Sequence, residues 1–269
     1  MNLKFKLLVA LVAFGITSFA QTLDKKKNYY VAAYGFWNVE NLYDTLNDPL
    51  RSDEEFTPEG VNAWTGPRYW KKIEHLAKVI SEMAIDATPE GLSCIGFCEV
   101  ENKNCLEDLA KDPQLKARNY QSVLIDGPYA RGVDPGFMYN PKHFKVTKVV
   151  TYPVPLAQDT GYKTRDELVV SGLLFGEPMA FIINHWPSRR GGELASRPGR
   201  ITAAKIARHI ADSIEKANPA TKIVIMGDLN DDPANESVKK HLNTVADFKK
   251  AKDGNYFNPM EPLHKQGIG

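Results

Sequence analysis

The sequence has few cysteines, little net charge and, after its first twenty residues, no long apolar run. The 34 basic and 33 acidic side chains give a net charge of +1, which argues against a strongly basic scaffold that coats nucleic acid. No segment after residue 20 is apolar enough to cross a membrane. There is no internal repeat, and no linker rich in proline, glycine or serine that would divide the chain of 269 residues. Its length suffices for a full hydrophobic core.

The three cysteines lie close together at Cys94, Cys98 and Cys105, and an odd number cannot be fully paired within one chain. One disulfide plus one free thiol is an open alternative in a secreted protein. Cys94 and Cys98 lie in the apolar stretch LSCIGFCEV, where buried thiols are common, and no histidine is near enough to suggest a zinc site. We therefore expect buried thiols.

Residues 1–20 have the pattern of a secretory signal peptide. Lys4 and Lys6 precede the apolar run LLVALVAFGI, which is short for a membrane span, and small residues lead to Ala20. We expect cleavage near Ala20 and a secreted or periplasmic mature chain; an uncleaved amphipathic anchor is the alternative. Cleavage would remove two lysines and no acid, so the net charge would change from +1 to +1 − 2 = −1.

Strands and helices are expected to alternate along residues 21–269, which we interpret as a single α/β domain with two sheets. Apolar residues at helical spacing predict helices, and runs rich in β-branched or aromatic residues predict strands. The predicted helices are 67–84, 106–112 and 197–217. The predicted strands are 28–41, 92–102, 120–126, 135–140, 143–154, 167–176, 179–186 and 222–228.

Four of these apolar strands end in side chains that carry oxygen or imidazole. The residues are Asn38 and Glu40, Glu99, Asn184 and His185, and Asp228 and Asn230. If the strands lie side by side, their ends form one rim around a cleft. Carboxylate and amide oxygens suit Mg²⁺ or Mn²⁺, with water and a substrate phosphate as further ligands. The pattern predicts a divalent-cation site that accepts a phosphate ester.

Each of these motifs has a simpler explanation when it is taken alone. Asn and Asp after a strand usually form turns, Glu99 could cap or pair at the surface, and His185 could be a structural histidine. The four motifs together are harder to explain as coincidence, because each follows an apolar strand.

Five motifs, in this order, resemble the endonuclease/exonuclease/phosphatase family of the deoxyribonuclease I-like fold. They are FWNVEN (36–41), GFCEVEN (96–102), RGVDPGFMYNP (131–141), INHWPSR (183–189) and MGDLND (226–231). The resemblance implies two packed mixed β-sheets flanked by helices, a four-layer α/β/β/α sandwich. It also implies metal-dependent cleavage of phosphodiesters or phosphomonoesters, on substrates that range from nucleic acids to phospholipids and inositol phosphates.

The resemblance also implies roles for single residues. Asn38 and Glu99 match metal ligands, and Glu40 stands where the family commonly has a carboxylate near the metal. His185 matches a histidine that contacts the phosphate, and Asp228 and Asn230 match the pair that orients water and holds the phosphate. Further substrate contacts are expected from Arg131, Asp134, Asn184, Arg189 and Arg190.

The family's last motif, a serine, aspartate and histidine on a terminal strand, is not present in the sequence. In the family, the histidine of this motif and its aspartate partner activate water. His264 lies in a loop-like tail and is a poor substitute, since a catalytic base needs tight positioning. We expect the sequence to be a piece of a longer active enzyme, with the fold incomplete at its C-terminus. A short protein with little activity and a binding module are the alternatives.

The substrate is less well specified. The loop 187–200 carries Arg189, Arg190, Arg197 and Arg200, which would place cations at the rim of the cleft if the loop is not simply solvated. These arginines suit a nucleic-acid backbone, a lipid headgroup or a polyphosphate. We expect a secreted phosphodiesterase or endonuclease that uses Mg²⁺ or Mn²⁺. A phosphomonoesterase, a phospholipid-cleaving enzyme and a phosphate-binding module are the alternatives, and we expect a monomer without a protein partner.

Overall fold

The computed structural model describes residues 29–156, 161–252 and 254–268. Val31–Gly269 form one compact unit. The expected signal peptide lies outside the described residues. Within these residues, none of the helices has the length and apolarity that a membrane crossing needs.

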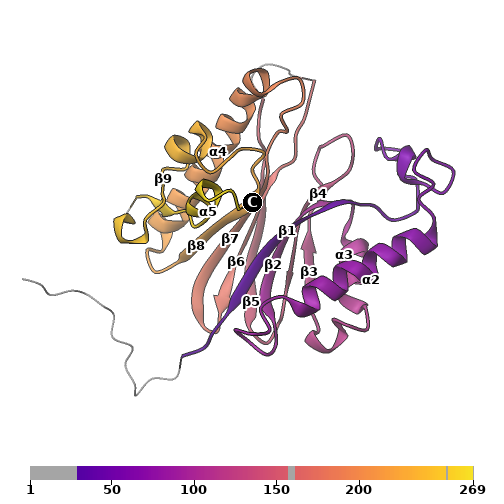
Figure 1. Ribbon diagram of the computed structural model, residues 1–269, viewed down its shortest axis with the longest axis horizontal. Helices are drawn as coiled ribbons and strands as arrows, with labels where there is room; N and C mark the ends of the chain where they lie inside the picture. Colours follow the sequence, from indigo (N-terminus) through magenta and orange to yellow (C-terminus); the bar gives the residue numbers. More distant parts are fainter. Residues whose placement is uncertain (1–28, 157–160, 253, 269) are drawn as a thin grey trace, which may run out of the picture. The chain divides into compact units, whose positions relative to one another are not determined.

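The first sheet contains the order β1-β2-β4-β3. Its strands are β1 (Ala33–Leu42), β2 (Leu92–Val100), β3 (Gln121–Leu124) and β4 (Asp134–Tyr139). β1 and β2 are parallel, and β4 runs antiparallel to both β2 and β3. Figure 1 shows α2 (Gly66–Glu82) and α3 (Lys103–Lys111) beside this sheet. α2 buries Tyr69, Ile73, Leu76 and Ile80 against it, as the apolar spacing predicts.

The second sheet has the order β5-β6-β7-β8. Its strands are β5 (Phe144–Tyr152), β6 (Glu167–Leu174), β7 (Glu177–His185) and β8 (Lys222–Asp228). Only the β7–β8 pair is parallel among these strands. α4 (Glu193–Ala217) covers this sheet with a row of alanines and Ile210.

The two sheets pack face to face through an aromatic core. Phe137 of β4, Phe144 of β5 and Phe181 of β7 contact one another with ring centroids 5.1–6.0 Å apart. At Gly96 of β2 an added Cβ would lie 2.6 Å from Met226 Sδ of β8, so glycine permits the close approach of the sheets. The predicted arrangement of two mixed sheets flanked by helices is confirmed.

Two sequence predictions require correction. α4 begins at Glu193, four residues before the predicted start at Arg197, and Pro198 lies inside it. The apolar spacing begins only at Ile201, but the turn before Pro198 is helical and Ser196 donates its hydroxyl to Gly192 O. The tail 229–268, predicted to be loop-like around His264, has short elements instead. They are η3 (Ser237–His241), β9 (Thr244–Val245), η4 (Phe248–Lys250), β10 (Tyr256–Phe257) and α5 (Met260–Lys265).

Two further 3-10 turns, η1 (Glu54–Phe56) and η2 (Lys116–Arg118), join the elements of the first sheet. All three cysteines are free and fully buried, as expected from the apolar sequence around Cys94 and Cys98.

Candidate active site

The polar ends of strands from both sheets meet at one place. Glu99 of β2, His185 of β7 and Asp228 of β8 each offer a ligand atom, and these atoms all lie within 4.8 Å of one another. β7 and β8 are parallel neighbours with His185 opposite Asp228, so their C-terminal ends share one edge of the sheet. β2 packs against β7, where Cys98 Sγ donates to Asn184 O. This contact brings the next residue of β2, Glu99, close to His185.

Asn38 of β1 joins the two sheets at this point. Its Nδ2 donates to Glu99 Oε1 at 3.0 Å and to Asp228 Oδ2 at 2.9 Å. Its Oδ1 accepts the backbone N–H of Glu40. One amide therefore holds two carboxylates that are 129 residues apart in the chain close together, and this concentrates negative charge in a small volume.

Bulges direct the side chains at the ends of β1 and β2. The β1–β2 register shifts between Asn38 and Leu42, and the β2–β4 register shifts between Phe97 and Val100. Glu99 has φ +62°, a left-handed conformation that is costly for a residue other than glycine and that tends to occur at functional sites. The bulge turns the Glu99 side chain out of a strand that is otherwise buried.

His185 is almost completely buried beside the two carboxylates. Its Nε2 lies 3.9 Å from Glu99 Oε1 and 3.8 Å from Asp228 Oδ2, and its Nδ1 has no hydrogen-bond partner among the described residues. Burial, together with the positive charges of Arg165 and Arg131, lowers the pKa of His185 to about 3. The imidazole is therefore neutral at neutral pH, and it can donate one N–H without carrying a charge.

Asp228 and Asn230 form the end of β8. The Asn230 backbone N–H donates to Asp228 Oδ1 at 3.0 Å, and Asn230 Nδ2 donates to Trp186 O. Asn230 has φ +51°, which asparagine tolerates better than most residues. The turn that sequence statistics predict for GDLND is present, and it also fixes the direction of the Asp228 carboxylate.

These groups border a cleft with a volume of about 870 Å³. Glu99, His185, Asp228 and Asn230 form one side of it, and the guanidinium groups of Arg131, Arg165 and Arg190 also line it. The cleft thus combines carboxylates, which can hold a divalent cation, with arginines, which bind phosphate oxygens.

Arg165 is a component of the cleft that the sequence analysis missed. It is 5% exposed, its guanidinium carbon lies 3.7 Å from the centroid of the Tyr129 ring, and its Nε has no hydrogen-bond partner among the described residues. The predicted site residues follow strands, whereas Arg165 precedes β6. Because β6 runs antiparallel to β7, its start lies at the same edge as His185.

Several predicted site residues are not part of this group. Glu40 is exposed, and its backbone oxygen accepts from Lys72 Nζ. Asn184 is fully buried, and its amide donates to Ile182 O and Met226 O. Side chains alternate along a strand, so Asn184 faces away from the cleft that His185 faces.

Asp134 and three of the predicted arginines also lie elsewhere. Asp134 is buried, and its Oδ2 accepts the Gly127 N–H. Arg189 is exposed and donates to Asn230 O and to the Asp232 carboxylate. Arg200 is buried and contacts Asp231 Oδ1 at 2.7 Å, and Arg197 pairs with Glu193 on the surface of α4. Acidic partners hold these side chains away from the cleft: Asp231 and Asp232 after β8 for Arg200 and Arg189, and Glu193 for Arg197. His264 is exposed on α5 and does not line the cleft.

The fold and the site define a four-layer α/β protein with a cleft that suits a cation and a phosphate. Residues 32–269 match the family model described as endonuclease/exonuclease/phosphatase family, so the chain belongs to this family of phosphoester hydrolases. No curated protein matches the sequence.

Solved structures of the same fold are similar at low identity. A mannosyl-6-phosphatase from Bacteroides thetaiotaomicron is 12% identical with a TM-score of 0.51, and the similarity covers 78% of this chain and 68% of that one. The human nocturnin catalytic domain with bound sulfate is 17% identical with a TM-score of 0.49, covering 83% and 75%. Truncated TDP2 from Caenorhabditis elegans is 19% identical with a TM-score of 0.45, covering 62% of this chain and 59% of that one. The match therefore spans less than two thirds of the TDP2 chain.

Proposed function

We propose that the chain is a phosphodiesterase that requires Mg²⁺ or Mn²⁺ and hydrolyses nucleic-acid or related phosphodiester bonds. The observation that carries this proposal is the pairing of Glu99 and Asp228 by one amide at the edge of a cleft lined by Arg131 and Arg165. The two carboxylates come from different sheets, and they offer hard oxygen donors in a small volume next to a neutral imidazole. This donor set fits a hard divalent cation better than a soft one.

Glu99 and Asp228 would hold the ion, with Asn38 beside them. The bound ion would supply a Lewis acid that polarises the phosphoryl group. Arg165 and Arg131 bind the phosphate oxygens, and the buried position of Arg165 preserves the strength of that interaction. His185 donates an N–H to the charge that develops on the phosphoryl oxygens. Asp228, oriented by the Asn230 N–H, positions the attacking water.

The arginines of the cleft also give weight to a second candidate activity. Arg131, Arg165 and Arg190 together supply three positive charges at the cleft. A phosphodiester carries one negative charge and a phosphomonoester close to two, so a monoester would also find enough cationic partners. We keep a phosphomonoesterase of the same fold as the alternative.

The test is hydrolysis of bis-p-nitrophenyl phosphate and of p-nitrophenyl phosphate by the purified chain with Mg²⁺ or Mn²⁺. We expect turnover of the diester that EDTA abolishes and that Glu99→Gln lowers by at least 100-fold, an order-of-magnitude figure for the loss of a charged ligand. Glu107→Gln, an exposed change of the same type on α3, should leave activity unchanged. Preference for the monoester would favour the alternative, and no turnover from folded protein would refute both.

We also propose that the chain is exported, because residues 1–20 have the pattern of a signal peptide. N-terminal sequencing of protein from the medium or periplasm should begin at Gln21. A start at Met1 in protein that stays inside the cell would refute the proposal.

A further inference from the structure

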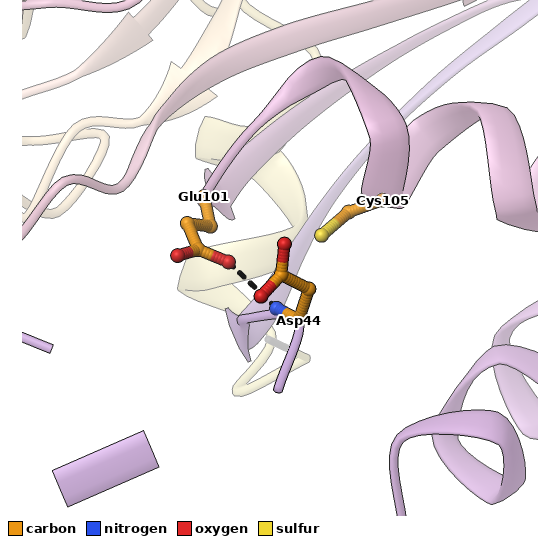
Figure 2. A group of neighbouring side chains, drawn as sticks. All are labelled: Asp44, Glu101 and Cys105. Atoms are coloured by element: carbon orange, nitrogen blue, oxygen red, sulfur yellow. Dashed lines mark hydrogen bonds between the residues drawn. The ribbon is translucent and has the colours of Figure 1, made fainter. Parts of the chain in front are cut away.

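A second group of acidic side chains lies outside the cleft. Asp44 follows β1, Glu101 follows β2 and Cys105 lies in the first turn of α3, and a ligand atom of each lies within 4.8 Å of the others. Figure 2 shows the three side chains together, with the Asp44 backbone N–H donating to Glu101 Oε2. Asp44 and Glu101 line a small pocket, and Cys105 lies beside it.

The pocket has a volume of about 140 Å³ and a strongly acidic lining. Five carboxylic side chains line it, together with a single cationic one, Arg51. The five are Asp44, Asp48, Glu101, Asp126 and Asp134. Arg51 has two partners, since its Nε lies 3.9 Å from Asp48 Oδ2 and its Nη1 donates to Tyr129 O, so one cation faces five acids. So many like charges around a small volume repel one another unless a cation neutralises them.

Two buried carboxylates at this place have oxygen atoms without partners, which is an independent sign of a ligand. Asp134 lines the pocket and is 1% exposed; its Oδ2 accepts the Gly127 N–H, but its Oδ1 has no partner among the described residues. Asp53, next to Asp48 through a hydrogen bond to the Asp48 N–H, is equally buried and also has an unpartnered Oδ1. Buried polar atoms are costly when they have no partner.

We propose that this pocket binds a Ca²⁺ ion, separate from the metal of the catalytic cleft. The available donors are carboxylate oxygens and the amide oxygen of Asn47, and Ca²⁺ takes six to eight such oxygens, water included, in flexible geometry. Asn102 Nδ2 already donates to Asp44 Oδ2, which orients that carboxylate.

Cys105 does not change the choice of ion. Its thiol is fully buried beside the pocket and is not among the residues that line it, so a Cys105 thiolate is not one of the available donors. A zinc site would need that thiolate or an imidazole. The residues that line the pocket include no histidine.

The ion would stabilise the wall of the catalytic cleft. Ser52 N–H donates to Ala130 O, and the Tyr43 hydroxyl donates to Arg131 O, so the segment 43–52 is attached to the segment 129–131. That second segment carries Tyr129 and Arg131, which line the cleft. Binding at the acidic pocket would therefore order a surface that contacts substrate, although the ion itself lies outside the reaction.

The test is calorimetric titration of the metal-stripped full chain with CaCl₂. Glu99→Gln serves as the background, because, on the proposed function, it should weaken metal binding in the cleft. We expect one Ca²⁺ to bind Glu99→Gln and to raise its melting temperature. Adding Glu101→Gln or Asp44→Asn should weaken this binding at least tenfold, whereas adding Glu59→Gln, an exposed change of the same type, should leave it unchanged.

Three results would overturn the proposal. The first is that Glu99→Gln binds no Ca²⁺, and the second is that binding is equally strong after Glu101→Gln and Asp44→Asn. The third is that Zn²⁺ or Mg²⁺ binds the same pocket more tightly than Ca²⁺. If circular dichroism shows that one of the two pocket variants is unfolded, the other decides. If both are unfolded, the titration of Glu99→Gln with the three ions decides. None of these measurements depends on catalytic activity.

Discussion

Arg165→Met should remove most of the activity while it leaves the fold intact. Methionine retains the unbranched apolar stem that packs in the cleft wall and deletes the guanidinium group. A hydrogen bond to a charged group contributes about 1.5–3 kcal/mol, and each 1.4 kcal/mol is a factor of ten in rate, so kcat/KM for bis-p-nitrophenyl phosphate should fall about 10- to 150-fold.

The stability of the same variant should change little. The contact of the Arg165 guanidinium with the Tyr129 ring stabilises the fold by about 0.5–2 kcal/mol. The unpartnered buried Nε costs a similar amount, so the two effects should nearly cancel. Urea unfolding should therefore show a shift below about 1 kcal/mol. Loss of activity at constant stability is what separates a substrate contact from a structural residue.

Arg197→Met is the matched control, because Arg197 pairs with Glu193 on the surface and does not line the cleft. Its kcat/KM should stay within about twofold of the wild-type value. Arg165→Lys should restore part of the activity, since it returns the charge without the two-pronged donor geometry. The reasoning is refuted if Arg165→Met keeps nearly full kcat/KM, or if Arg197→Met loses as much.

Three further changes test the packing and the buried charges around the site. Glu167 is buried with both carboxylate oxygens unpartnered, and burial raises its pKa well above 4.5. The folded state therefore holds a proton that the unfolded state releases, so stability falls as pH rises above about 4.5. Glu167→Gln should remove this pH dependence, so that the loss of about 1–3 kcal/mol in the free energy of unfolding at pH 8, measured in urea, disappears. The exposed change Glu177→Gln should keep the pH dependence of the wild type. Equal pH dependence in the two variants would contradict the assignment. Gly227, with φ +151°, would bring a Cβ to 2.1 Å from Asn184 O, so Gly227→Ala should cost about 1–3 kcal/mol and displace Asp228. Thermal unfolding of both variants tests this: Gly66→Ala, which has open space around it, should be neutral or stabilising. Equal losses of stability in the two variants would count against the steric argument. Arg200→Met breaks a buried ion pair with Asp231 and should destabilise the fold by about 3–5 kcal/mol, against less than about 1 kcal/mol for Arg197→Met, whose ion pair with Glu193 lies on the surface. Similar midpoints in urea for both arginine variants would refute the distinction.

The centre of the candidate site could be predicted because its residues follow strands. A buried strand has a strong apolar pattern, and a polar residue directly after it stands out. Parallel pairing then places such residues at one edge, as it does for His185 and Asp228. The same reasoning could have excluded Asn184, since strand alternation places it and His185 on opposite faces. The two-sheet architecture also followed from these patterns, together with the resemblance to the family.

The remaining parts of the site depend on contacts that local sequence does not encode. Arg165 joins the cleft because β6 is antiparallel to β7, and strand direction is a property of the whole sheet. Arg200 looked like a rim cation but contacts Asp231, which lies 31 residues away, within the fold. Asp134 was predicted to be a cleft residue, but the Gly127 N–H donates to its Oδ2, and Asp134 lines the acidic pocket instead. Strand pairing places Arg165, a partner 31 residues away directs Arg200, and a turn seven residues earlier in the chain directs Asp134.

The candidate active site is therefore a product of the packing between the sheets rather than of either sheet alone. Asn38 and Glu99 belong to the first sheet, and His185 and Asp228 to the second; Asn38 Nδ2 connects the carboxylates across the boundary. Glu99 and Asn230 both have positive φ, and such strain persists only when the surrounding packing stabilises it. Close approach at Gly96 and Gly227 supplies that packing, because a Cβ at either position would meet atoms of the neighbouring strands within 2.6 Å. A change that separates the sheets by a fraction of an ångström should thus affect the four residues together, so that activity is lost before the fold is.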